Sequence, residues 1–201
     1  MSRVTADVKQ ATRARLVAAA AQEFARAGLE RANVDAISLA AGYAKGTIYN
    51  YFASKEDLFL AVVEQASRQA AAASAAPAGA PARDRLAAVL AGFCSWVGEN
   101  DAFARVLVRE CLMGTPGLYP RVILAEAPLT GELETILGEG ARGGEFRDDV
   151  PAGILALAMA GLADLAMAGH WASGGARPAL EDIPELVLTL LLGSRSAGGD
   201  L

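Results

Sequence analysis

The chain has 201 residues, of which 53% are hydrophobic and 20% are charged, and its formal net charge is −5. This length can bury one sizeable core, or a small first domain and a larger second one. The two cysteines, Cys94 and Cys111, are too few for a disulfide framework and lack the spacing of metal ligands. We therefore expect a protein that holds neither a metal nor another cofactor.

Apolar residues recur at three- and four-residue spacing along almost the whole chain, which predicts an all-α protein of about nine helices. The first 16 residues contain no apolar run and give no sign of a signal peptide. The first predicted helix covers residues 12–27, and Gly28 ends it. Asn33 is a good N-cap for a second helix over residues 34–41.

Residues 33–52 predict a helix-turn-helix motif, because Gly42 supplies a turn between the second helix and a third over residues 45–52. A fourth helix begins after Ser54 and continues to about residue 75. Residues 1–55 hold eight Lys or Arg and four Asp or Glu, whereas the rest of the chain holds ten basic and nineteen acidic residues. A basic first domain on an acidic second one confines the attraction for DNA to the first.

In a helix-turn-helix unit the second helix enters the major groove of DNA. Lys45 and Lys55 stand at predicted helix starts, where the helix dipole disfavours a cation by roughly 0.3–1 kcal/mol unless an anion docks there. Gly46 permits close approach of the backbone to a base, and tyrosine hydroxyls can donate to phosphates. The residues that we expect to face DNA on these grounds are Lys45, Gly46, Thr47, Tyr49, Asn50, Tyr51 and Lys55.

The stretch ANVDAISLAAGYAKGTIYNYFASKEDLF closely resembles the DNA-binding domain of tetracycline-repressor-type (TetR/AcrR) transcriptional regulators. The matching elements are VDAISLAAG, the turn YAKGT, the segment IYNYF and the helix start SKEDL, together with Phe24 and Gly28. The resemblance covers roughly residues 10–70. It implies a three-helix DNA-binding domain joined by the fourth helix to a helical body that dimerises and usually binds a small ligand.

The resemblance also implies roles for single residues. Asn33 stands where the family often has Thr or Ser, and it can still cap the helix and donate to DNA. Tyr43 replaces a small aliphatic residue, so it either touches DNA or packs inside the domain. The family positions that contact DNA, or lie near the bases, correspond here to Lys45, Gly46, Thr47, Tyr49, Tyr51 and Lys55.

Residues 70–84 contain Pro77, Gly79 and Pro81, and we interpret them as the joint between the DNA-binding domain and a body over residues 82–195. The most apolar stretch, residues 154–168, contains Asp164 and is shorter than the roughly 20 residues needed to cross a bilayer. It therefore predicts no membrane segment. The helices expected in the body cover residues 83–98, 101–113, an interrupted stretch up to about 140, 151–171 and 180–194.

The last two predicted helices, residues 151–171 and 180–194, are apolar on more than one face. Such helices need cover on both sides, and a second subunit can supply it. The family architecture implies the same arrangement. We therefore expect a homodimer formed through these two helices.

An apolar ligand pocket is expected in the body, although each candidate residue taken singly is more often part of a core. Arg105, Arg109 and Asp164 are candidate polar groups for orienting a ligand. Cys94 and Cys111 are either a redox sensor or inert buried thiols, and their apolar neighbours favour the second. The candidate pocket residues are Phe93, Trp96, Phe103, Leu107, Cys111, Met113, Met159, Met167, His170 and Trp171, with Tyr119 as a further neighbour.

The sequence and the resemblance together predict a cytoplasmic, sequence-specific DNA-binding transcriptional regulator. It would be a repressor that binds a palindromic operator in double-stranded DNA and is released by a small apolar ligand. The alternative is an architectural DNA-binding dimer without a ligand, which a filled core would favour. An enzyme is not expected, because the chain has one histidine and no nucleophile or phosphate-binding motif.

Overall fold

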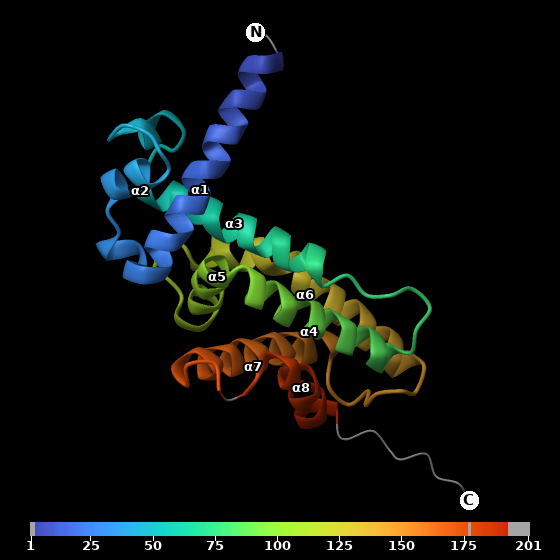
Figure 1. The fold of residues 1–201 in the computed structure, drawn as a ribbon. Helices are drawn as coiled ribbons and strands as arrows, with labels where there is room; N and C mark the ends of the chain where they lie inside the picture. The colour runs from blue at the N-terminus through green and yellow to red at the C-terminus, as the bar shows by residue number, and fades with distance from the viewer. Residues whose placement is uncertain (1–2, 177, 193–201) are drawn as a thin grey trace, which may run out of the picture.

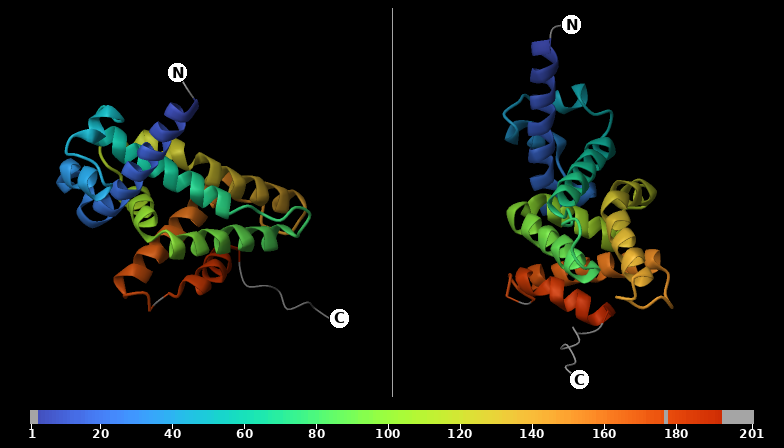
Figure 2. Two further views of the ribbon diagram at one scale, coloured as in Figure 1. Left: turned by 45° about the horizontal axis from the view of Figure 1, so that its top comes forward. Right: turned by 90° about the vertical axis from the view of Figure 1, so that its right-hand side faces the viewer.

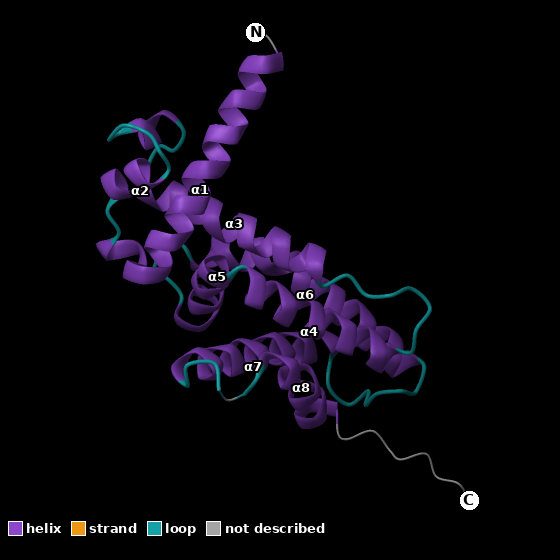
Figure 3. Cartoon of the chain, in the orientation of Figure 1, coloured by secondary structure: helices purple, strands orange, loops and turns teal. Residues whose placement is uncertain are grey.

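The computed structural model describes residues 3–176 and 178–192, which form eight α-helices and two short 3-10 helices (Figure 1). Helices and loops account for all of these described residues, in agreement with the all-α prediction (Figure 3). The elements in chain order are α1 (Arg3–Arg31), α2 (Val34–Ala40), η1 (Thr47–Asn50), α3 (Lys55–Ala73), α4 (Ala82–Glu99), α5 (Asp101–Met113), α6 (Tyr119–Arg142), α7 (Ala152–Ala172), η2 (Leu180–Asp182) and α8 (Ile183–Leu192).

The predicted third helix over residues 45–52 is wrong, because the structure has only the four-residue 3-10 helix η1 there. Gly46 adopts a left-handed backbone with φ 77° directly before η1, so no α-helix can run through it. The segment TIYN that follows is composed of poor helix formers.

The predicted start of the first helix at residue 12 is also wrong, since α1 (Arg3–Arg31) begins at Arg3. Its predicted end agrees with a break in the helix at Gly28. Gly28 interrupts α1 with φ 75° and ψ 169°, yet the chain resumes helical geometry after it. The last helix begins at Ile183 after the short η2. Residues 193–194, which we had included in that helix, lie outside the described part of the chain.

The head, defined here as α1, α2, η1 and the first turn of α3, is assembled around two phenylalanines. The rings of Phe24 in α1 and Phe59 in α3 meet edge to face, with centroids 5.0 Å apart. Ile37 of α2 and Ile48 of η1 are both 1% exposed and close this core. Burial of these side chains supplies most of the stability of so small a unit.

The body consists of the remainder of α3 with α4 to α8. α3 packs on α1 at one end and on α4, α5 and α6 along its length, so it connects head and body as one continuous helix. Residues 74–81 turn the chain back at the end of the body far from α2 (Figure 1). The connection between head and body therefore runs through α3 itself.

Two positions in the body differ from simple sequence rules. Gly92 of α4 crosses the end of α3 so closely that a Cβ there would lie 2.1 Å from the Ala73 carbonyl oxygen. α6 is continuous through Pro128, where an interruption was expected. Pro128 and Leu124 both lie on the exposed side of α6, so water can reach the carbonyl that loses its N–H partner.

α7 and α8 form a layer at the end of the molecule opposite the N-terminus (Figure 2). α7 packs on α5 and α6, and α8 packs on α4 and α7. With 21 residues, α7 is longer than the stretch judged from sequence, and by length and composition alone it could cross a membrane. The large apolar side chains that this layer exposes are Ile154, Leu157, Leu165, Leu186 and Leu190.

Candidate nucleic-acid interface and effector cavity

The turn between α2 and α3 presents a row of polar groups to solvent. Ile48 anchors η1 in the core, and this places the neighbouring Tyr49 outside with 59% of its surface exposed. Lys45 and Asn50 are exposed as well, and the Lys45 side chain makes no hydrogen bond or ion pair with the described part of the chain. Three of the predicted contacts are therefore free to meet a ligand outside the protein.

The other predicted residues of this turn are less exposed. Tyr51 is half-buried and packs against the core, while Gly46 and Thr47 are half-buried at the start of η1. A Cβ on Gly46 would meet no atom within 4 Å, but its φ of 77° favours glycine. The backbone conformation thus gives a sufficient reason for glycine here, independent of any approach to a base.

Asn33 caps α2 as predicted. Its Oδ1 accepts from the N–H groups of Asp35 and Ala36 at 3.0 and 3.1 Å. Its own backbone N–H donates to Glu23 in α1 at 3.1 Å. The side-chain amide nitrogen takes no part in the cap and stays available to DNA.

Lys55 has a protein partner that sequence reasoning missed. Its Nζ donates to the Glu30 carbonyl oxygen at 2.9 Å, near the end of α1. This contact satisfies a helix C-terminal carbonyl and holds the charge beside the turn. An ammonium group has three donors, so two remain for a phosphate.

Two residues of α1 support the turn. The Tyr43 hydroxyl donates to Thr12 Oγ1 at 3.2 Å, and both residues are mostly shielded from solvent. Tyr43 therefore packs inside the head. The Arg13 guanidinium lies 5.0 Å from the centre of the Phe52 ring, a cation–π contact that brings positive charge to the same region. Both contacts join residues far apart in the chain, so no periodic pattern in the sequence predicts either.

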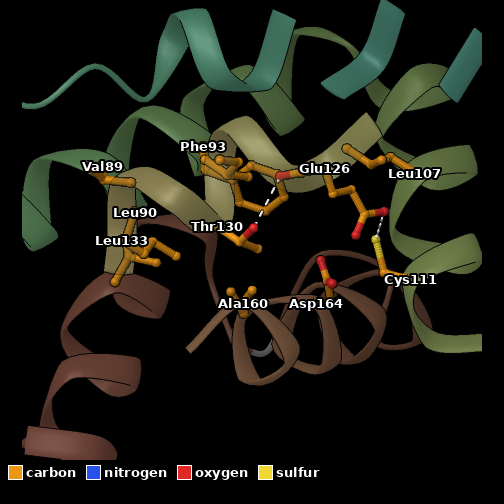
Figure 4. A pocket seen from close by; sticks show the side chains of 12 residues that line it. Val89, Leu90, Phe93, Leu107, Cys111, Glu126, Thr130, Leu133, Ala160 and Asp164 are labelled. Carbon is orange, nitrogen blue, oxygen red and sulfur yellow. Dashed lines mark hydrogen bonds between the residues drawn. The ribbon is translucent and has the colours of Figure 1, made fainter. Parts of the chain in front are cut away.

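A small cavity of about 40 Å³ lies in the body between α4, α5, α6 and α7 (Figure 4). Such a volume holds a few water molecules, whereas sites for drug-sized ligands measure about 300–1,000 Å³. The residues that line it are Val89, Leu90, Phe93, Leu107, Cys111, Glu126, Leu129, Thr130, Leu133, Ala160, Ala163 and Asp164.

Of the ten predicted pocket residues, Phe93, Leu107 and Cys111 line this cavity. Asp164, named as a polar candidate, lines it as well. The other seven lie outside the lining. Trp96 stacks against Phe93, Phe103 packs on the core elsewhere, and Met159 and Met167 are buried in the core. Met113 is 79% exposed, His170 donates to the Pro178 carbonyl, and the Trp171 ring lies beneath the Arg105 guanidinium.

The polar groups of the cavity are gathered at one end. The Cys111 thiol of α5 donates to Glu126 Oε1 of α6 at 2.8 Å, and Asp164 of α7 faces this pair (Figure 4). Burial, then the charge of Glu126, raises the pKa of Asp164 to about 8. Burial also raises the pKa of Glu126. Sequence reasoning missed Glu126 and Thr130, because charged and polar residues on a helix usually face water.

The thiols are unsuited to redox sensing. Burial raises the pKa of Cys94 to about 12. Burial and the neighbouring carboxyl groups of Asp164 and Glu126 raise the pKa of Cys111 far above its ordinary value. The thiolate is the reactive form, so both groups remain inert thiols near neutral pH.

The family model of bacterial regulatory proteins of the tetR family matches residues 16–62. This range covers the second half of α1, all of α2 and η1, and the start of α3. The HTH-type transcriptional repressor AcnR of Corynebacterium diphtheriae is 30% identical over 166 residues, or 82% of this chain and 83% of AcnR. The chain belongs to the tetR family. It is a DNA-binding transcriptional regulator, as its sequence predicted.

Further tetR-family relatives span most of the chain. The repressor NicS of Pseudomonas putida is 31% identical over 153 residues, covering 73% of this chain and 71% of NicS. Among solved structures, the regulator FadR of Bacillus subtilis in complex with stearoyl-CoA superposes with a TM-score of 0.79 at 24% identity. That match covers 90% of this chain and 98% of FadR, and it shows that the tetR-family fold extends through the body.

Head and cavity of this tetR-family protein meet on α5. Cys111 enters the cavity, while Arg109, two residues earlier, donates to the Phe24 carbonyl oxygen of α1 at 3.0 Å. The Arg109 guanidinium also lies 3.8 Å from the position that a Cβ on Gly28 would take. A displacement of α5 at the cavity would therefore alter the contact between Arg109 and α1 near the interruption at Gly28.

Proposed function

We propose that this chain is a repressor that binds a palindromic operator as a homodimer and is released by a small, mainly apolar ligand. The relatives AcnR and NicS bear the name of repressors. The observation that carries the proposal is the shared use of α5, which lines the cavity through Cys111 and holds α1 through Arg109. A body that only dimerised would need neither a cavity nor a contact between a cavity-lining helix and α1.

The DNA-contacting surface that we propose is made by the exposed side of η1 and the helix ends around it. Lys45, Tyr49 and Asn50 are exposed there, and Lys55 keeps two donors free beside them. Most of these contacts would go to phosphates and would position the head, while Thr47 and Gly46 lie closest to the groove. The positive balance of residues 1–55 favours this orientation.

The homodimer would form through α7 and α8. Ile154, Leu157 and Leu165 lie on one exposed stripe of α7, and Leu190 of α8 is 62% exposed beside them. So much apolar surface in one layer is expected to be covered. A second copy offers the same surface in a two-fold arrangement.

The cavity is too small for a ligand of ordinary size, so a ligand has to stabilise a more open arrangement of α4 to α7. Its effect on DNA binding is then limited by its differential affinity for the two arrangements. The FadR structure in complex with stearoyl-CoA supports a small-molecule ligand for a protein of this fold. The architectural alternative predicted a filled core, and the free volume beside two carboxyl groups argues against it.

The proposed protein acts in the cytoplasm, where it reaches DNA, and performs no catalysis. α7, although apolar enough to cross a membrane, packs on α5, α6 and α8. We assign its exposed stripe to the second subunit. The groups of the cavity are two carboxyls and a protonated thiol, which supply recognition and no activated nucleophile.

Transcription from a promoter that carries a duplex selected by this protein from random sequence tests the proposal. Addition of the purified protein is expected to lower transcript yield from that promoter and to leave a promoter with a scrambled duplex unchanged. Equal effects on both promoters, or an increase of transcript, would contradict the repressor.

A further inference from the structure

We propose that the effector of this protein is a small hydrophobic amine, whose ammonium group is held by the carboxyl groups of Asp164 and Glu126 at the polar end of the cavity. This inference rests on the proposed function, since it assigns the chemical class of the ligand to that site. It starts from two acids that share an apolar cavity with no cation beside them.

Asp164 is 8% exposed and lines the cavity, where its carboxyl lies beside Glu126 and Cys111 (Figure 4). The Cys111 thiol is a hydrogen-bond partner of the Asp164 carboxyl, and it also donates to Glu126 Oε1 at 2.8 Å. One S–H group cannot serve two acceptors at once. Asp164 and Glu126 therefore share a single thiol donor, although Asp164 is more than nine-tenths buried.

No Lys, Arg or His is among the described residues that line the cavity. Two carboxyl groups in such surroundings disfavour ionisation of each other, and burial adds to the effect. These surroundings keep a proton on Asp164 near neutral pH, in line with its pKa of about 8. A cation in the cavity would reverse this balance and ionise both groups.

An ammonium group fits the donors and acceptors that are present. It offers three N–H donors, and Asp164 and Glu126 supply acceptors from α7 and α6 on two sides. The Thr130 oxygen on α6 is a third acceptor in the lining. Charge-assisted hydrogen bonds of this kind are about twice as strong as neutral ones.

The opposite end of the cavity defines the rest of the ligand. Val89, Leu90 and Leu133 lie there, away from the acids, and Phe93 lies between the two ends (Figure 4). An aliphatic or aromatic group attached to the nitrogen would bury its surface against them. At the polar end, an anionic ligand would meet two acids and no cation among the described lining residues, so carboxylates and phosphates are excluded from the polar end.

A purely structural role for the acids is the competing explanation. Buried carboxyl groups are costly unless they are well paired, and an apolar or amide replacement is then often neutral or stabilising. A single variant therefore distinguishes between the two explanations. If Asp164 serves recognition, Asp164→Asn should fold at least as stably as the original protein and bind an amine more weakly.

Calorimetric titration of the full-length protein with 1-aminooctane, 1-octanol and octanoate at pH 7 tests the inference. The three probes share an alkyl chain and differ in the polar group. We expect octylammonium to bind at least about tenfold more tightly than octanol, and octanoate more weakly than both. Asp164→Asn and Glu126→Gln should each weaken octylammonium about tenfold and change octanol by less than about twofold.

Glu134→Gln, an exposed acid on the same helix as Glu126 but outside the cavity lining, is the matched control and should bind all three probes as the original protein does. The inference is overturned if octanol or octanoate binds as tightly as octylammonium, if octylammonium does not bind at millimolar concentration, or if both cavity variants keep its affinity. Operator binding by the same preparation is measured separately, so the proposed repressor can stand when the amine fails.

Discussion

At the scale of single residues, we propose that the Lys55 side chain serves both the fold and DNA binding. Its Nζ donates to the Glu30 carbonyl and still has two donors for a phosphate. We expect Lys55→Ala to weaken binding on specific and random duplexes alike, and to lower the slope of log affinity against log salt by about one. Fluorescence titrations at several salt concentrations measure this slope. Arg68→Ala, an exposed cation of α3 far from the turn, should leave it unchanged, and an unchanged slope for Lys55→Ala would remove Lys55 from the phosphates.

Gly46 is required by its backbone conformation. A Cβ there would meet nothing within 4 Å, so Gly46→Ala adds strain at φ 77° without a steric clash. We expect this change to destabilise the protein by about 1–2 kcal/mol, measured by denaturant unfolding. Gly131 in α6 also has open space around it but no positive φ, and Gly131→Ala should stabilise by about 0.5–1 kcal/mol. If both substitutions change the free energy of unfolding in the same direction, backbone conformation does not determine the effect of alanine at these two positions.

Asp164 makes stability depend on pH in a direction opposite to that of most acids. Its folded pKa of about 8 lies above the unfolded value, so the folded protein holds an extra proton between about pH 4 and pH 8. Stability should therefore fall as pH rises through this window, by at most about 1.4 kcal/mol per unit, and level off above pH 8. The titratable groups facing it are Glu126 from α6 and Cys111 from α5.

Unfolding free energies of the original protein and of Asp164→Asn between pH 5 and pH 8 give the measurement. The variant lacks the titrating group, so its stability should depend less on pH than that of the original protein. Parallel curves would mean that Asp164 is ionised in the folded protein or that its carboxyl is exposed.

At the scale of elements, α5 is the physical link between cavity and head. Arg109 donates from α5 to the Phe24 carbonyl at 3.0 Å and lies 3.6 Å from Glu110 of the same helix. We expect Arg109→Gln to leave probe binding in the cavity within about twofold, because the side chain lies outside the lining. It should reduce the change in DNA affinity that a bound probe produces.

Operator affinity measured with and without a bound probe tests this role. Arg105→Gln is the matched control, since Arg105 is also on α5 but contacts Asp101 and Trp171 instead of α1. If Arg109→Gln keeps the full effect of the probe on DNA affinity, the link runs through another helix.

Helix periodicity predicted most elements of the fold because the packing of α3, α4, α5 and α7 follows it closely. It failed where backbone conformation or tertiary packing overrides a local pattern. The segment IYNYF has the spacing of a helix, yet the left-handed backbone of Gly46 before it leaves only η1. α6 passes through Pro128 because that face is exposed to water.

The site was predicted unevenly for a related reason. The residues that we propose to contact DNA lie in one local motif, so chain order places them together. The cavity is assembled from four helices, and only crossing geometry decides which apolar side chain faces it. Met159 and Met167 were equally good candidates by composition but are buried in the core instead. Glu126 could not be predicted, since its partners Cys111 and Asp164 come from two other helices.

At the scale of the whole molecule, the proposed dimer through the α7–α8 layer would determine how two heads are held. Leu157 is 62% exposed on the stripe that we assign to the second subunit. Leu157→Lys would bury a charge at such an interface, so we expect it to convert the dimer to monomer at micromolar concentration. Sedimentation measures the mass. Leu124→Lys, at a leucine of α6 that is 73% exposed, should leave the mass unchanged, and a dimeric Leu157→Lys would place the interface elsewhere.

We propose that the two basic heads of the dimer bind one palindromic operator. Two-fold symmetry of the protein then requires two half-sites whose centres lie about one helical turn, 34–36 Å, or a multiple of it apart. Selection of random duplexes by the purified protein, read by sequencing, with the mass of the protein–DNA complex taken alongside, tests this most directly. The account predicts an enriched palindrome bound by an even number of protomers. Weak, steeply salt-dependent binding with no enriched sequence, or one protomer on a single half-site, would contradict it.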